Sequence, residues 1–195
     1  MKIVIITPET LVDQELETCN ELLQHDVRLH IRKPHGSKDE LTRYLDQIDP
    51  LHYKKISLHQ HHSLVEELKL GGKHWKSDQI IDNQCLTIRS KSFHNWEDLV
   101  QETAAIDYGF LSPIYDSISK RGYTSGFDET KLKKWVTHSK PFPVYALGGV
   151  TFDKLEALQD LGFDGAALLG AFWNLSDIKL RLKTLKQITH GNSKR

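Results

Sequence analysis

Two short stretches near the C-terminus decide the fold: PVYALGGV at residues 143–150 and GFDGAALLGA at residues 162–171. Each holds a run of small, branched or aromatic residues typical of a buried strand, followed by glycine. Between the two runs, Thr151 is an expected N-cap before Lys154-Leu155, which predicts a helix. Strand, helix and strand in this order form the unit of a parallel sheet covered by helices.

The same alternation extends over the rest of the chain. Further candidate strands are residues 3–6, 27–31, 55–58, 73–75, 86–88 and 108–111, which with 143–147 and 165–169 make eight. Apolar residues take helical spacing at 16–23 and 96–100, and Ser37 is an expected N-cap before Glu40. The segment 76–84 is too short to predict a helix, and an amphipathic helix containing Ile178, Leu182 and Leu185 follows the eighth run.

This pattern predicts the α/β class and a single-domain (β/α)8 TIM barrel over residues 1–190, with a polar tail at 191–195. An open doubly wound sheet is the alternative. A chain of 195 residues has room for one such domain and for no second domain of ordinary size.

Composition narrows the possible partners and compartment. Lys and Arg number 26 and Asp and Glu number 26, so no general attraction to nucleic acid or to an anionic membrane is expected. Cys19 and Cys85 lie far apart and favour reduced, buried thiols over a disulfide framework. The apolar run Ile3–Ile6 is too short for a signal peptide or a membrane span, which predicts a cytoplasmic protein. The sequence does not specify an oligomeric state.

In a barrel of this kind, ligands bind just beyond the carboxyl ends of the strands. Gly148-Gly149 and Gly170 follow the last two runs, where backbone N–H groups can approach a phosphate; tight turns are the alternative reading. The loop from Ser112 to Tyr123 carries several hydroxyls and Lys120, which suit contact with phosphate oxygens.

Histidines and one arginine complete the set of candidates. Strand alternation puts His30 and Arg32 on one face, and Arg32 needs an anionic partner if that face is the barrel interior. The tract His59-Gln60-His61-His62, with His52 and His74 nearby, could indicate a metal-binding site. We interpret it instead as a solvated or helix-start cluster, because only His59 falls at a strand end and no HExxH-like face forms.

Several motifs resemble the thiamine phosphate synthase and thiazole tautomerase family. SPIYDSISK at 112–120 is similar to the family's G-P-[VI]-F-x-T-x-[TS]-K loop. ALGGV at 146–150 and GFDGAALLGA resemble its A-I-G-G-I and G-A-D-G-V-A-V-V-S-A, and Ser92-Phe93-His94 resembles its S-x-H after the fifth strand.

The resemblance implies an enzyme of thiamine biosynthesis. It would join hydroxymethylpyrimidine pyrophosphate to thiazole phosphate and release pyrophosphate, acting on small phosphorylated substrates. By this resemblance Gly148, Gly149 and Gly170 hold the thiazole phosphate, and Arg32, Lys120, Ser117 and Ser119 hold the leaving diphosphate. Ser92, His30 and His59 are further expected substrate contacts, and His94 is a further catalytic candidate.

Departures from the family pattern concern the Mg²⁺ that the resemblance implies. Gln60 and Gln79 stand where the family has carboxylates, leaving Asp78 as the remaining candidate ligand. Amides lack the charge that holds a hard cation. Thiazole tautomerase, which needs proton transfer and no magnesium, is therefore an alternative, with His94 or His30 as the available imidazole. The tautomerase's expected catalytic histidine is Pro113 here, so a non-catalytic binder of the same phosphates is a third possibility.

Overall fold

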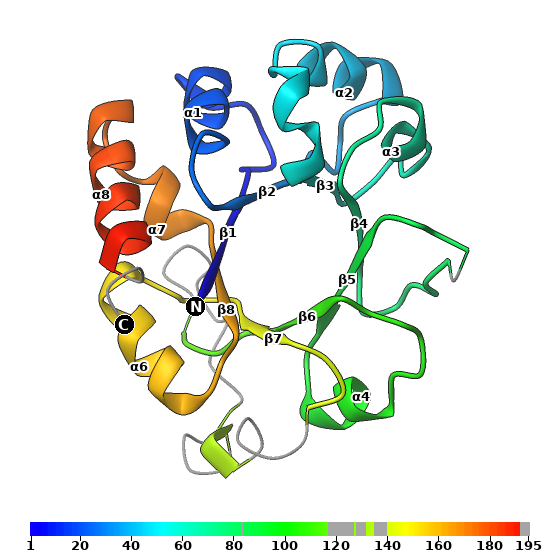
Figure 1. Cartoon of the computed structure of the whole chain (residues 1–195), viewed down its shortest axis with the longest axis vertical. Coiled ribbons are helices and arrows are strands. Elements are labelled where there is room, and N and C mark those ends of the chain that lie inside the picture. The colour runs from blue at the N-terminus through cyan, green and yellow to red at the C-terminus, as the bar shows by residue number, and fades with distance from the viewer. Residues whose placement is uncertain (83, 117–126, 128–131, 135–139, 192–195) are drawn as a thin grey trace.

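The computed structural model describes residues 1–82, 84–116, 127, 132–134 and 140–191. Its strands are parallel neighbours in chain order and close into a barrel of eight, β1 to β8, seen end-on in Figure 1. The strands are β1 (Lys2–Ile6), β2 (Arg28–Ile31), β3 (Ile56–Leu58), β4 (Gly72–Trp75), β5 (Ile88–Phe93), β6 (Tyr108–Leu111), β7 (Val144–Ala146) and β8 (Gly165–Leu168). The predicted (β/α)8 barrel is confirmed, and the open sheet is excluded because β1 pairs with β8.

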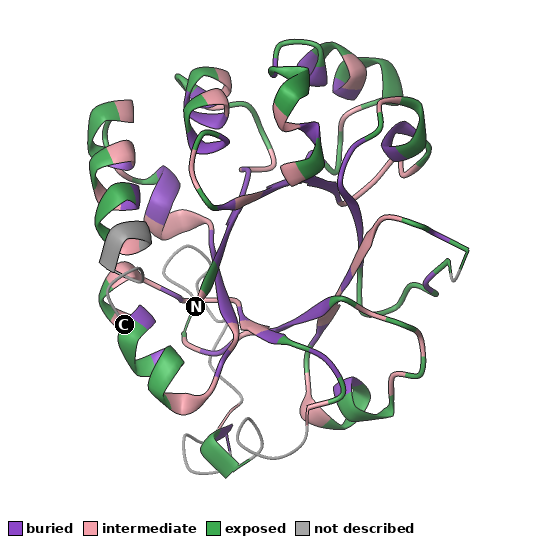
Figure 2. Ribbon diagram, in the orientation of Figure 1, coloured by how far each residue is buried: buried purple, intermediate pink, exposed green. Residues whose placement is uncertain are grey.

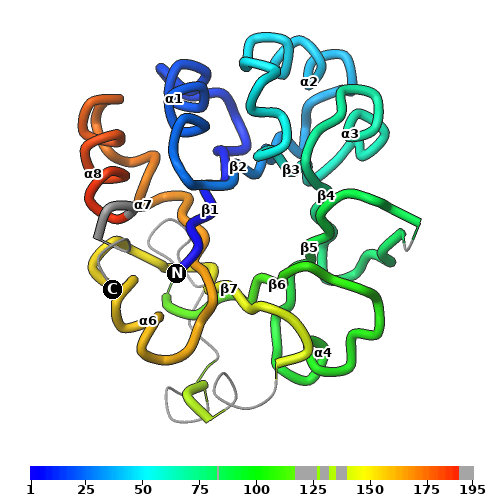
Figure 3. The backbone as a smooth tube through the Cα atoms, in the orientation of Figure 1, coloured from blue at the N-terminus to red at the C-terminus, as the bar shows by residue number. Residues whose placement is uncertain are grey.

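Helices form a ring outside the strands (Figure 1). They are α1 (Glu15–Leu22), α2 (Lys38–Leu45), η1 (Pro50–Lys55), α3 (Ser63–Glu67), α4 (Trp96–Gln101), η2 (Phe152–Lys154), α6 (Leu155–Leu161), α7 (Gly170–Trp173) and α8 (Ile178–Gly191). Figure 3 shows α8 returning beside α1, so the last helix closes the ring on the first. No helix in the described part of the chain is both long enough and apolar enough to cross a bilayer.

Both predicted N-cap residues lie at helix starts, but only one of them caps its helix with its side chain. Ser37 begins α2 with a full capping box, in which its side chain and that of Glu40 each bond the other's backbone N–H. Thr151 is the N-cap of η2, a short 3-10 turn, without a side-chain cap bond, and α6 follows from Leu155.

Seven of the eight predicted strands agree with the structure to within one residue at each end. The fifth is wrong. It was expected at 86–88, but Leu86 is fully exposed and β5 runs from Ile88 to Phe93.

Buried residues lie along the strands and on parts of the surrounding helices (Figure 2). Most of their side chains belong to two clusters, a smaller one inside the barrel and a larger one between the strands and the helices. Strand alternation divides β1 between them: Val4 and Ile6 lie in the interior cluster, while Ile3 and Ile5 pack in the larger outer cluster. Burial on both faces explains why β1 reads as an unbroken apolar run.

Candidate active site at the carboxyl rim

All eight strands are parallel, so their carboxyl ends meet at one rim of the barrel. Arg32 directly follows β2 and Gly149 lies just beyond β7, which puts both at this rim as predicted. Ser117, Ser119 and Lys120 were expected beside them, but these three lie outside the described residues.

Three histidines lie together inside the barrel near this rim. His30 belongs to β2, His59 directly follows β3, and His74 belongs to β4. Nδ1 of His30 lies 3.0 Å from Nε2 of His59, and the ring centroids of His59 and His74 are 4.2 Å apart. With one ring nitrogen taken from each residue, the nitrogens all lie within 4.8 Å of one another. The neighbouring strands therefore bring three imidazoles to one point.

Hydroxyl groups hold the other ring nitrogens of this cluster. The Tyr108 hydroxyl lies 2.6 Å from Nε2 of His30. In His74, Nδ1 lies 2.9 Å from Oγ of Ser90 and Nε2 lies 2.9 Å from Oγ of Ser92. A hydroxyl can donate or accept, so it satisfies either tautomer of the neutral ring. Ser92 was expected beyond the fifth strand; it lies within β5 instead, and its side chain contacts His74.

Burial lowers the pKa of all three imidazoles. It takes the pKa of His74 to about 3, and the charges of His62 and Arg32 act in the same direction. The pKa values of His30 and His59 also fall well below the ordinary histidine value, first through burial and then through repulsion from His74. All three rings are therefore neutral near pH 7, and each offers one nitrogen lone pair.

The histidines of the tract His59–His62, which follows β3, have different surroundings. His62 is the N-cap of α3 and its Nε2 lies 3.0 Å from the carbonyl of His74, while Nε2 of His61 lies 2.8 Å from the carbonyl of Gly36. The interpretation as a helix-start cluster therefore holds for these two residues. It is wrong for His59, which contacts His30 instead.

Arg32 forms an ion pair across the rim with Glu9, which lies beyond β1. The guanidinium and carboxylate are 2.6 Å apart, with the two side chains 31% and 40% exposed. The backbone N–H of Arg32 also donates to Oγ1 of Thr7 at 2.9 Å. The positive charge of Arg32 contributes to lowering the pKa of both His59 and His74.

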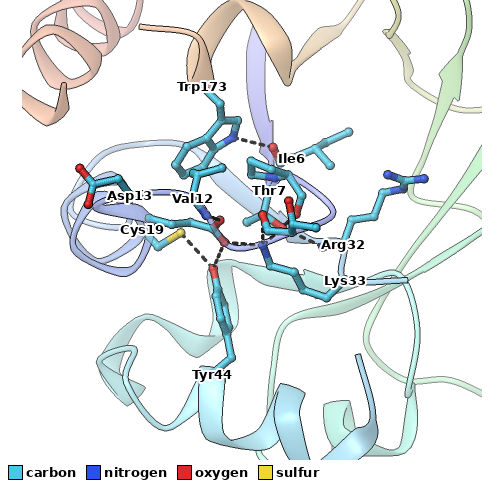
Figure 4. Close-up of polar contacts among 12 residues, drawn as sticks. Ile6, Thr7, Val12, Asp13, Cys19, Arg32, Lys33, Tyr44 and Trp173 are labelled. Atoms are coloured by element: carbon cyan, nitrogen blue, oxygen red, sulfur yellow. Dashed lines mark hydrogen bonds and ion pairs between the residues drawn. The ribbon is translucent and has the colours of Figure 1, made fainter. Parts of the chain in front are cut away.

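A buried ion pair fixes the loop between β1 and α1 (Figure 4). Nζ of Lys33 lies 2.7 Å from Oε1 of Glu15 and donates to the carbonyls of Pro8 and Thr10. The Lys33 side chain is 11% exposed and that of Glu15 is fully buried. Lys33 thus points away from the barrel interior and holds the loop that carries Glu9.

Tyr44 and Cys19 extend this network on the helix side (Figure 4). The Tyr44 hydroxyl donates to Oε1 of Glu15 at 2.7 Å and lies 3.5 Å from Sγ of Cys19. Burial raises the pKa of the Cys19 thiol to about 12. The thiol therefore stays protonated, which suits a packing residue rather than a nucleophile.

Glycines end β7 and β8. Gly148 and Gly149 have φ values of +87° and +64°, a region that favours glycine. A Cβ on Gly148 would lie 2.8 Å from Cα of Pro113, so the loop after β6 packs directly on the loop after β7. Gly170 is the first residue of α7. Among the described residues, no acceptor receives a hydrogen bond from the backbone N–H of Gly149 or Gly170.

A family model described as thiamine monophosphate synthase matches residues 3–172. This range runs from β1 into α7 and includes the three histidines, Arg32 and both glycine loops. The chain belongs to the thiamine monophosphate synthase family.

Individual members of this family are similar to the chain in sequence and in structure. The solved thiamine phosphate pyrophosphorylase of Bacteroides thetaiotaomicron is 28% identical, with a TM-score of 0.80 over 96% of this chain and 98% of that one. A curated thiamine-phosphate synthase of the same organism is 26% identical over 169 residues, covering 76% of this chain and 78% of its own. That of Anoxybacillus flavithermus is 29% identical over 98 residues, which is 50% of this chain and 45% of the relative. The chain thus spans under half the length of that relative.

Gln60, Gln79 and Asp78, which the sequence resemblance assigns to the magnesium positions, do not form a set of ligands that suits that ion. The side-chain nitrogen of Gln60 is buried without a partner, and Gln79 is exposed and accepts the backbone N–H of Lys76 at 2.8 Å. Asp78 is exposed as well. Mg²⁺ requires oxygen ligands in near-octahedral geometry and is held mainly by carboxylates and phosphates. Over the described residues, the single close group of three or more His, Cys, Asp or Glu side chains is the histidine cluster.

Some site residues were not anticipated. Ser90 and Tyr108 pair across β5 and β6, and both face the histidines. Strand alternation from Phe110 would have placed Tyr108 inside the barrel, whereas no local pattern links Glu9 to Arg32. His94, expected as a catalytic candidate, is exposed, and its Nδ1 lies 3.1 Å from the carbonyl of Ser112.

Proposed function

We propose that this chain couples hydroxymethylpyrimidine pyrophosphate to thiazole phosphate and releases pyrophosphate. The observation that carries the proposal is the family match over residues 3–172, which takes in the rim on both sides of the barrel. Relatives of similar length are named thiamine-phosphate synthase and thiamine phosphate pyrophosphorylase. We therefore assign the rim residues to the substrates of this step of thiamine biosynthesis.

The thiazole phosphate is assigned to the glycine loops. Side chains are absent at Gly148, Gly149 and Gly170, so an anion can reach the backbone there. The first N–H groups of a helix have no partner within it, and Gly170 begins α7. Backbone N–H groups of Gly149 and Gly170 would thus donate to the phosphate oxygens.

The leaving diphosphate is assigned to Arg32, with Ser117, Ser119 and Lys120 as its expected further contacts. Arg32 is paired with Glu9, so an incoming diphosphate competes with that carboxylate for the guanidinium. Ser92, His30 and His59 would face the pyrimidine side. The chemistry asked of these groups is to stabilise the departing charge and hold the thiazole nitrogen in line.

A coupling assay with both substrates tests the proposal, with thiamine phosphate and pyrophosphate measured in the presence and absence of magnesium. Gly149→Ala should lower turnover strongly, because its methyl group meets the loop after β6 and blocks the phosphate. Gly162→Ala is the matched control: Gly162 also has a positive φ, at the end of α6 away from the rim. Equal losses in both variants would indicate backbone strain alone and remove the phosphate role.

The second candidate, thiazole tautomerase, is favoured by one observation: Gln60 and Gln79 do not suit magnesium. Isomerisation would need only a proton carrier, and His30 and His94 are the available imidazoles. Tautomerase turnover that is lost in His94→Ala or His30→Ala, with no coupling, would place the chain on that branch. Binding of thiazole phosphate without either turnover would identify a non-catalytic binder.

A further inference from the structure

We propose that His30, His59 and His74 together bind one Zn²⁺ ion at the mouth of the barrel. The three ligands are other residues than Gln60 and Gln79, although His59 directly precedes Gln60, and the site does not depend on the coupling reaction. Metal binding can be measured without any substrate, so the two proposals can fail separately.

The geometry of the three side chains is close to that of a tetrahedral centre. Nitrogen ligands bind zinc at about 2.0–2.1 Å, which puts them about 3.4 Å from each other. Nδ1 of His30 and Nε2 of His59 are already 3.0 Å apart. All three nitrogens lie within 4.8 Å of one another, so bringing in His74 requires a side-chain movement on the order of 1 Å.

Hydroxyls already occupy the positions of a metal site's outer partners. A zinc-bound imidazole carries its proton on the other ring nitrogen and donates it to an oxygen, which fixes the ring. Tyr108 would accept from Nε2 of His30 while Nδ1 binds the ion. Ser90 or Ser92 would accept from one nitrogen of His74 while the other binds. The ion would lie between Nδ1 of His30 and Nε2 of His59 in place of their hydrogen bond, and the hydrogen of that bond would move to the outer nitrogen of the same ring, so that both rings stay neutral.

The ligand type selects the metal. Imidazole suits zinc and its transition-metal neighbours, whereas magnesium prefers oxygen. Three protein ligands leave the fourth tetrahedral position for water or a ligand oxygen. His59 is partly exposed while His30 and His74 are buried, so the open position faces the rim where the phosphates are proposed to bind.

The test uses untagged, full-length protein that has been treated with chelator and dialysed. Titration with Zn²⁺ by calorimetry should give one ion per chain, and Co²⁺ should develop the visible bands of a tetrahedral nitrogen site. Magnesium in large excess should not displace either ion. His59→Gln should weaken Zn²⁺ binding by more than ~100-fold, since even outer partners are worth 10–100-fold.

Two further variants make the result specific. His52→Gln changes a histidine that bonds Gln24 outside the cluster, and its zinc affinity should equal that of the parent. Tyr108→Phe keeps all three ligands but removes the outer partner of His30, so affinity should fall ~10–100-fold at unchanged stoichiometry.

His59 is the least buried of the three, so its substitution should leave the fold intact, which circular dichroism of the metal-free variants verifies. Absence of zinc and cobalt binding in the parent chain would overturn the proposal. Parental affinity in a folded His59→Gln would overturn it as well, and in either case the cluster is a hydrogen-bonded layer of the barrel interior.

Discussion

Replacing Glu15 by Ala tests how the rim is held together. Glu15 has a fully buried side chain, and its carboxylate receives the Lys33 ammonium at 2.7 Å and the Tyr44 hydroxyl at 2.7 Å. A third contact is the backbone N–H of Val12 at 3.1 Å. The substitution removes all three acceptor contacts and leaves the charge of Lys33 without its carboxylate.

The size of the effect follows from burial. Removing one partner of a buried ion pair costs about 3–5 kcal/mol, because the other charge stays desolvated. Lys33 keeps the carbonyls of Pro8 and Thr10, which places the expected loss at the lower end, about 3 kcal/mol. Total stabilities are about 5–15 kcal/mol, so the variant should still fold.

Urea unfolding, monitored by circular dichroism, measures this loss. The dependence of the unfolding free energy on urea concentration should be the same in the parent and the variant. Asp26→Ala is the control: its pair with Lys2 is exposed, 65% on the lysine and 85% on the aspartate side, and should be worth about 0–1 kcal/mol. The double variant Glu15→Leu with Lys33→Met should recover most of the loss, since an apolar pair needs no counter-charge. A cost under about 1 kcal/mol for Glu15→Ala would refute the reasoning.

Two smaller predictions concern single side chains. Because the pKa of Cys19 is about 12, only on the order of 10⁻⁴ of its thiol is ionised at pH 8, and iodoacetamide should not modify it in the native chain. Mass spectrometry checks this, and a native rate equal to that of the urea-unfolded chain would contradict it. Ser37→Ala removes the bond from the backbone N–H of Glu40 to the Ser37 side chain, while the backbone N–H of residue 37 can still donate to the Glu40 carboxylate, and it should lower the free energy of unfolding by about 1 kcal/mol in urea titrations. An unchanged midpoint would show that α2 does not depend on its cap.

Most strands could be predicted from sequence because their buried faces are apolar. β1 and β8 are buried along almost their whole length, which gives continuous runs. β5 was misplaced for the opposite reason. Its residues Ser90 and Ser92 face the barrel interior but are polar, so hydrophobic periodicity passes over them. Leu86, which supplied the apolar signal, is exposed.

The candidate site was predictable where it follows strand ends and not where it depends on distant partners. Arg32 and the glycine loops were located by their position after predicted strands. The cluster of His30, His59 and His74 brings together residues on or directly after three neighbouring strands, and it depends on the register of those strands, which one sequence does not reveal. The pairing of Arg32 with Glu9 is likewise a property of the closed barrel, since each residue leaves a different strand.

The interior of this barrel is divided into an apolar half and a polar half. Val4, Ile6, Phe110 and Ala167 fill one side, as branched and apolar side chains usually do in such barrels. On the side of β2 to β5, the buried residues include His30, Ser57, His74 and Ser90. An unpaired polar group in such a place costs about 1–3 kcal/mol, and here hydrogen bonds between side chains offset that cost.

An apolar layer would fill the same space without requiring matched partners. Local departures of this kind are expected at functional sites, and this one lies directly beneath the rim where ligands bind in barrels. The polar half supplies nitrogen donors from side chains, whereas the glycine loops of β7 and β8 supply backbone N–H groups. Under the two proposals above, opposite parts of one rim offer lone pairs to a cation and hydrogen-bond donors to an anion, which together would suit a phosphorylated substrate whose oxygen completes a metal centre.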